Sequence, residues 1–161
     1  MKQLFCILVI LLLFLCGCQK EDTVVFYYCP TDPLETAQSS LLASEVRTVT
    51  GYTDNLFFLI SLYLSGPLEP ELVSPFPVGT KLHYTTTECP HITVKLQELP
   101  QTMSDSEFSL SCACLSMTVM ELTGADSVTV VCGNRTVTMD ASTLLFFDEL
   151  TPNTTAPGGT Q

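Results

Sequence analysis

Cysteine and histidine are the residues of this chain with the clearest potential for chemistry. The sequence contains eight cysteines and two histidines, His83 and His91. Cys89 lies close to both histidines along the chain, and thiolate and imidazole groups are common zinc ligands. No two cysteines have the C-x₂-C spacing of a zinc ribbon, however, and a histidine at the start of a strand is commonly solvated. We therefore expect no catalytic residue, no metal site and no bound cofactor.

The first residues have the layout of a secretory signal, with one positive charge before an apolar run over residues 4–15. That run is shorter than the roughly 20 apolar residues that a membrane-spanning helix needs. Behind it, residues 15–18 (LCGC) resemble a lipobox, the site at which bacterial lipoproteins are processed. The resemblance implies cleavage after Gly17 and a diacylglycerol group on the Cys18 sulfur. Cys16 fits less well because bulky residues precede it. An ordinary signal peptide or an uncleaved anchor helix is the alternative.

These features divide the chain into four parts. We expect a lipoprotein signal peptide over residues 1–17, a short lipidated linker over 18–22, one folded domain over 23–148 and a disordered tail over 149–161. The tail is rich in Thr, Pro and Gly, and such a segment cannot bury enough apolar surface to offset its ordering entropy.

The chain is strongly acidic, with a formal net charge of −11. A negative surface repels both nucleic acid and anionic lipid headgroups. This excludes nucleic acid as a partner. It also means that attachment to a membrane must come from the lipid on Cys18, at the extracytoplasmic face of a bacterial cell membrane.

Five cysteines remain after the signal peptide and the lipidated residue, and an odd number cannot all pair within one chain: Cys29, Cys89, Cys112, Cys114 and Cys132. Two interpretations stay open, namely small buried hydrophobic residues or one disulfide bond. Cys112 and Cys114 lie two residues apart, which points them to different faces of a helix. Cys29 and Cys89 are the easiest to place at the surface.

Hydrophobic patterns predict six strands and two helices. The strands are expected over residues 23–28, 41–50, 81–87, 91–97, 127–132 and 136–139, and the helices over 56–64 and 104–123. Thr53 or Asp54 is expected to cap the first helix, and Ser104 with Glu107 forms a capping box for the second. The order of the elements predicts an α+β fold, a single compact domain with two helices packed on a mostly antiparallel sheet.

The first helix is apolar on two sides. One side carries Leu56, Phe57, Leu59, Ile60, Tyr63 and Leu64, and the other carries Phe58 and Leu62. We therefore expect this helix to be buried on two sides. A last apolar cluster, residues 144–147, is expected to pack on the body of the domain.

A proline-rich connection, residues 66–79 (GPLEPELVSPFPVG), follows the first helix. Its prolines stiffen the chain and lower the entropy of the unfolded state, which is one interpretation. The other is that Val73, Phe76 and Val78 form an interaction surface, packed partly on the domain and partly on a partner.

Gly66-Pro67, followed by residues 72–80 (LVSPFPVGT), resembles the GerMN domain of bacterial sporulation and spore-germination proteins. In that family a short helix ends in Gly-Pro, and a similar connection leads into a hairpin, a long helix and a closing strand pair. The same elements are expected here in the same order. The resemblance covers roughly residues 23–148.

The resemblance implies a fold similar to ring-building modules of transenvelope complexes. It also implies a membrane-anchored, non-enzymatic lipoprotein that acts by protein–protein contact in sporulation or germination, with an envelope protein or a second copy as partner. The chain departs from the family in its cysteine content and in having one domain where some members have two. The alternative is an envelope lipoprotein that captures a small molecule or a cell-wall fragment, which a preformed apolar cavity of roughly 300–1,000 Å³ would favour.

Overall fold

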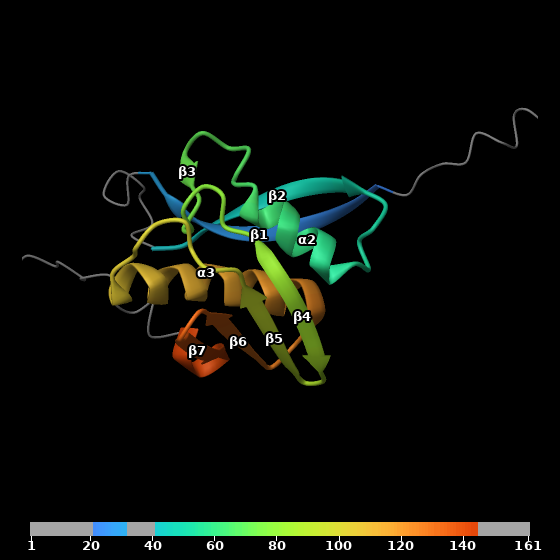
Figure 1. Ribbon diagram of the computed structural model, residues 1–161. Helices are drawn as coiled ribbons and strands as arrows, with labels where there is room; N and C mark the ends of the chain where they lie inside the picture. Colours follow the sequence, from blue (N-terminus) through green and yellow to red (C-terminus); the bar gives the residue numbers. More distant parts are fainter. Residues whose placement is uncertain (1–20, 32–40, 145–161) are drawn as a thin grey trace, which may run out of the picture.

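The computed structural model describes residues 21–31 and 41–144, in which the chain forms seven strands, two helices and a helical turn at residues 141–144 (Figure 1). The predicted signal peptide, the lipidation site Cys18 and the predicted tail lie outside the described residues. The elements in chain order are β1 Glu21–Pro30, β2 Ala43–Thr50, α2 Leu56–Leu64, β3 Leu72–Val73, β4 Leu82–Glu88, β5 His91–Leu96, α3 Asp105–Thr123, β6 Ser127–Cys132 and β7 Arg135–Asp140. Neither helix is long and apolar enough to cross a membrane.

The first sheet has the strand order β2-β1-β3. β1 pairs antiparallel with β2, from Glu21 opposite Thr50 to Tyr28 opposite Ala43, and β3 pairs with the last two residues of β1. β1 begins two residues before the boundary predicted at Thr23. β3 lies inside the proline-rich connection, where no strand was predicted.

The second sheet has the strand order β4-β5-β6-β7. The predicted hairpins β4–β5 and β6–β7 are confirmed, and the two central strands β5 and β6 run parallel, joined through α3. The predicted α+β class is confirmed as well. The strands form two sheets, however, and not the one sheet that the sequence had suggested.

Helix α3 lies between the two sheets, in contact with β1 on one side and with β6 and β7 on the other (Figure 1). Its capping box forms as predicted, and Gly124 ends it in the left-handed conformation with φ 69°. Cys112 and Cys114 point to different faces, as predicted, and both are buried because each face meets a sheet. This helix is therefore the middle layer of the molecule.

Helix α2 begins at a different cap from those predicted. The Asn55 side chain, and not Thr53 or Asp54, accepts a hydrogen bond from the Phe58 N–H. Only one side of the helix is buried, through Leu59, Ile60 and Tyr63. The expectation of burial on two sides is wrong, because one side of α2 packs on the body of the domain and the other faces solvent.

The core joins both sheets to both helices. Tyr28 of β1 stacks on Tyr63 of α2, with ring centroids 4.8 Å apart, and Phe26 meets Tyr63 edge to face. On the other side of α3, the alternation predicted for β5 is confirmed, since Ile92, Val94 and Leu96 are buried. Leu144, the one described residue of the predicted last cluster, packs on this core.

Candidate interaction surface

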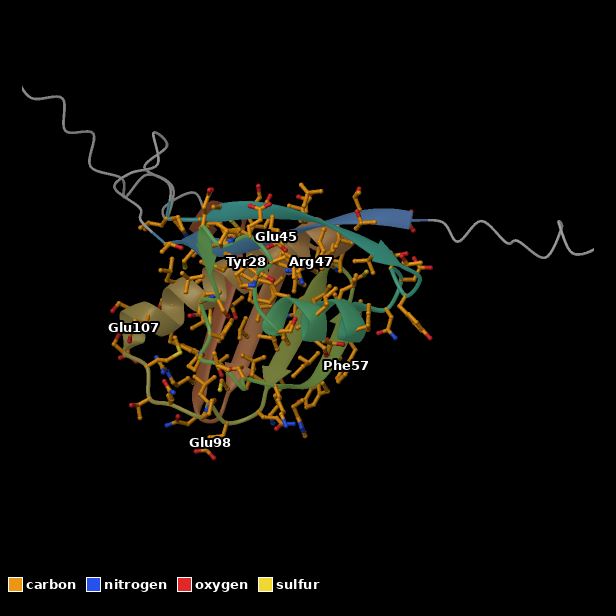
Figure 2. The ribbon with its side chains drawn as sticks, turned by 90° about the horizontal axis from the view of Figure 1, so that it is seen from above. Tyr28, Glu45, Arg47, Phe57, Glu98 and Glu107 are labelled. Atoms are coloured by element: carbon orange, nitrogen blue, oxygen red, sulfur yellow. The ribbon has the colours of Figure 1, made fainter. Side chains whose placement is uncertain are left out.

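A buried ion pair holds the start of the proline-rich connection. Glu45 and Arg47 both face inward from β2, and the guanidinium group of Arg47 binds the Glu45 carboxylate. The second oxygen of Glu45 accepts hydrogen bonds from the backbone N–H groups of Leu68 at 2.7 Å and Glu69 at 3.1 Å. Arg47 also donates to the carbonyl of Gly66 at 3.1 Å. Figure 2 shows Glu45 and Arg47 close to Tyr28, with Phe57 apart from them.

The surroundings of this pair favour the ionised form of the Glu45 carboxyl group. Burial opposes the charge on Glu45, but the hydrogen bonds from Glu69, Arg47 and Leu68 outweigh it and lower the pKa of the carboxyl group. The Arg47 guanidinium lies over the Phe26 ring, 5.1 Å from its centroid. Burial raises the pKa of nearby Tyr28 to about 12, so this hydroxyl stays protonated and donates to the Tyr63 carbonyl.

Further contacts fix the rest of the connection. The Ser111 hydroxyl of α3 donates to the Pro75 carbonyl, and the Thr80 hydroxyl donates to the Pro77 carbonyl at 2.7 Å. Phe76 is only 3% exposed and belongs to the core. The prediction that Phe76 forms part of an interaction surface is therefore wrong, because its ring anchors the connection to the domain. The connection is held at both ends and in the middle.

Large apolar side chains lie exposed around α2. Phe57 is 47% exposed, and Tyr52 in the preceding loop lies against Phe58 with ring centroids 5.4 Å apart. Val78, at the end of the connection, is 92% exposed. We call these four residues, Tyr52, Phe57, Phe58 and Val78, the α2 surface.

Two open hollows flank Phe57, which lines both. The first, about 700 Å³, lies beside the N-terminus of α2 and is also lined by Asp22, Tyr52 and Asp54. The second, about 710 Å³, lies between the C-terminus of α2 and the ends of the connection, with Leu64, Pro67, Val78 and Lys81 among its lining residues. The first hollow therefore carries acidic groups and the second a basic one.

The three predicted surface residues do not all belong to the α2 surface. Val78 lines the second hollow, whereas Phe76 is in the core. Val73 lies on β3 opposite Cys29, is 47% exposed and lines neither hollow. Only Val78 of the predicted set belongs to the α2 surface.

The histidines lie on the second sheet, away from a common centre. His91 Nδ1 is 2.8 Å from the Ser127 hydroxyl, His83 stands on exposed β4 beside Tyr84, and Cys89 is exposed in the β4–β5 turn. Within residues 21–31 and 41–144, no group of three metal-ligating side chains is assembled.

In this structure none of the five described cysteines is bonded to another. Cys112, Cys114 and Cys132 are buried, whereas Cys89 is exposed and Cys29 is partly buried. The sulfur of Cys29 lies 3.8 Å from that of Cys114.

Comparison with known proteins identifies the fold of the domain. No family profile and no curated protein matches the sequence. Among solved structures, the tandem GerMN domains of the sporulation protein GerM from Bacillus subtilis superimpose on 74% of this chain with a TM-score of 0.54 and 16% identity. The domain has a GerMN-like fold.

The chain spans 41% of the length of that GerM structure, which holds two GerMN domains in tandem. An inferred lipoprotein from Clostridium perfringens has a TM-score of 0.44 and 17% identity, over 71% of this chain and 76% of its own. At such identities the likeness to GerM concerns the GerMN fold alone. The fold expected from the proline-rich motif is thus confirmed.

Sequence reasoning missed the two features that define this surface. Glu45 and Arg47 were not singled out, although two opposite charges at alternate positions of a strand share one face. The exposure of Phe57 was missed because its apolar neighbours made the whole helix look buried. The Asn55 cap fixes where α2 begins, and thus which side Phe57 occupies.

Proposed function

We propose that this chain is a bacterial envelope lipoprotein, anchored through lipid on Cys18, that acts by binding another protein in sporulation or spore germination. The observation that carries the proposal is the exposed α2 surface, centred on Phe57. The lipobox at residues 15–18 supports the anchor, and the GerMN fold shared with a sporulation protein supports the process.

The chemistry of the α2 surface suits protein recognition. Aromatic side chains in a contact region contribute large apolar areas with few rotatable bonds, and they are common anchors of binding energy. The connection that presents Val78 is fixed by Glu45, Arg47, Phe76 and Ser111, so little ordering entropy is lost when a partner docks. Aromatic and aliphatic groups bind without transferring protons, and we propose no catalytic step.

A ligand-binding lipoprotein is the second candidate, because the two hollows have volumes of about 700 and 710 Å³, within the usual range of small-molecule sites. Both are open to solvent, whereas a site for a small molecule usually encloses most of its ligand. A protein partner therefore fits the hollows better than a small molecule or a cell-wall fragment.

The experiment compares spores of a strain that lacks the gene with spores of the same strain after one copy of the gene has been restored. The copies encode the wild type, the double variant Phe57→Asp/Val78→Asp, and the control Val46→Asp, which places a single negative charge on an exposed valine of β2. An aspartate at position 57 lies in the first turn of α2, where a negative charge favours the helix. We expect the double variant to accumulate normally, to lose partner affinity by roughly 30-fold, as for an interface hot spot, and to give fewer heat-resistant spores.

Two results would contradict the proposal separately. Equal spore counts and germination rates with and without the gene would remove the role in sporulation and germination. A deletion defect that Phe57→Asp/Val78→Asp repairs as well as the wild type would keep the process but remove the α2 surface as the binding site.

A further inference from the structure

Two cysteine sulfurs from different layers of the domain lie in contact. Cys29 at the end of β1 and Cys114 in the middle of α3 are 85 residues apart in sequence, and their Sγ atoms are 3.8 Å apart. A disulfide bond has a length of about 2.05 Å, so the two sulfurs need to approach by less than a further 2 Å. Among the described cysteines no other pair shows such a contact, and the Cys132 thiol donates to the Gln97 carbonyl at 3.2 Å.

We propose that Cys29 and Cys114 form a disulfide bond in the mature, exported chain, which joins β1 covalently to α3. The inference rests on the proposed function, because disulfides form and persist outside the cytoplasm and are rare inside it. It also gives the odd number of cysteines a consistent arrangement, with one bonded pair, two buried thiols and one exposed thiol.

The exposure of the two sulfurs determines which cysteine reacts first with an oxidant. Cys29 is partly accessible, whereas Cys114 is fully buried. The hydrogen bond from the Cys114 thiol lowers the pKa of Cys29, which favours its thiolate, the nucleophilic form. The contact and burial raise the pKa of Cys114, so this sulfur keeps its proton until its partner has reacted. Cys29 is therefore the point at which an oxidant enters.

The oxidant is a second disulfide, either a small-molecule disulfide or an exchange protein. The Cys29 thiolate attacks one sulfur of that disulfide, which gives a mixed disulfide on Cys29 and releases one thiolate. The Cys114 sulfur then attacks Cys29 Sγ, the mixed S–S bond breaks, and the second thiolate leaves and takes up the Cys114 proton. Two electrons pass from the cysteine pair to the oxidant, which ends as two thiols.

The bond closes a long loop, and this has a measurable consequence. A cross-link between residues so far apart in sequence removes many conformations from the unfolded chain. For a domain of this size we expect reduction to lower the melting temperature by roughly 10 °C or more.

The test uses the full lipoprotein from cells quenched with acid, which stops thiol exchange, and its free thiols are then alkylated with N-ethylmaleimide in denaturing detergent near pH 7, where thiolates form. A native sample extracted from membranes in mild detergent serves for the melting measurements. Peptide mass spectrometry without reduction should find Cys29 linked to Cys114, with Cys89, Cys112 and Cys132 alkylated. Cys29→Ser and Cys114→Ala should each abolish the linkage and the effect of reductant on melting. Cys112→Ala is the matched control, because it removes a buried thiol of α3 outside the contact, and it should keep both.

Alkylation of all five cysteines, or a bond between any other two, would overturn the inference. A second arm separates the causes: the purified, reduced chain is incubated with glutathione disulfide. If the bond forms there but is absent from trapped cells, the compartment is reducing and the proposed export fails with the inference. If it does not form even there, the geometry fails and the proposed function is untouched.

Discussion

The Glu45–Arg47 pair holds two charges in the interior at a place where burial alone would penalise both. Desolvating a carboxylate and a guanidinium costs several kcal/mol each, and their mutual attraction offsets this only when the remaining hydrogen-bonding groups are also satisfied. Here the N–H groups of Leu68 and Glu69 and the carbonyl of Gly66 satisfy them. The pair therefore matters mainly because it fixes the connection that presents Val78.

Glu45→Gln tests this arrangement through its dependence on pH. The variant leaves Arg47 buried without a counter-charge, and we expect a loss of about 3–5 kcal/mol in the free energy of unfolding at pH 7. The pKa of Glu45 is lowered by folding, so its contribution is present above the unfolded pKa and is lost as the pH falls through the folded pKa. The difference between wild type and variant should therefore shrink in acid.

Urea unfolding of both proteins at pH 7 and at about pH 3 measures this difference. Glu71→Gln is the control, because Glu71 is an exposed carboxylate of the same connection, and its effect should stay within about 0.5 kcal/mol. An equal loss for Glu45→Gln at both pH values would show that the charge of Glu45 is not what stabilises the connection.

The inward direction of Glu45 and Arg47 could not be predicted from the strand alone. An isolated Glu-Val-Arg sequence favours Val46 inside and the charges outside, but Val46 is 64% exposed. Shifting a strand by one residue exchanges its two faces, and the register of β2 is set by its pairing with β1. Contacts with distant segments likewise bury Phe76 and leave Val78 exposed, although the two residues lie only two positions apart on one connection.

At the scale of elements, α3 meets β1 through small and hydroxyl-bearing residues. The backbone N–H of Tyr27, on β1, donates to the Thr118 hydroxyl of α3 at 2.9 Å. The Ser116 hydroxyl, two residues earlier on the same helix, is also buried, but it makes no hydrogen bond within the described structure. Two buried hydroxyls of one helix thus differ in whether they have a partner.

This difference predicts opposite outcomes for two conservative variants. Thr118→Val keeps the shape of the side chain but leaves the Tyr27 N–H without an acceptor, and we expect a loss of about 1–3 kcal/mol in the free energy of unfolding. Ser116→Ala removes a hydroxyl with no partner, so its effect should be near zero or stabilising. Denaturant unfolding of both variants measures this, and equal effects would contradict the assigned contact.

The elements that sequence predicted best are those fixed by neighbouring residues. The capping box of α3, the β4–β5 and β6–β7 hairpins and the end of α2 at Gly66-Pro67 all depend on residues within a few positions of each other. β3 and the division of the strands into two sheets depend on contacts between distant segments. One local feature of the sequence indicates that α3 lies between the two sheets: apolar and small residues surround the whole helix.

For the whole molecule, the distance to the predicted anchor is short. Two residues lie between Cys18 and Glu21, the start of β1, and each of the three steps that join them covers at most about 3.6 Å in an extended chain. A lipid on Cys18 would therefore hold the domain within about 10 Å of the lipid headgroups. Because the chain carries a net charge of −11, its own electrostatics give it no attraction to an anionic surface.

Cell fractionation distinguishes a lipid anchor from a charge-based one. Cys18→Ala should move the chain out of the membrane fraction, whereas Cys16→Ala, at the neighbouring cysteine, should leave it there. Washing wild-type membranes with 1 M salt, which screens charges beyond about 3 Å, should release almost none of it. Release by salt, or retention of Cys18→Ala, would contradict the lipid anchor.

The place of β1 in its sheet has a mechanical consequence. β1 is the strand nearest the anchor and also the central strand of its sheet, with β2 along one edge and β3 at the end of the other. Interstrand hydrogen bonds of antiparallel strands run perpendicular to the strand direction. Glu21 pairs with Thr50, and Tyr52 of the α2 surface follows Thr50 by two residues, so the anchor and the α2 surface lie at the same end of the β1–β2 pair. Tension between the membrane and a partner on the α2 surface would therefore load the hydrogen bonds of this pair one after another, beginning at Glu21. The first sheet would then open stepwise from its anchored end.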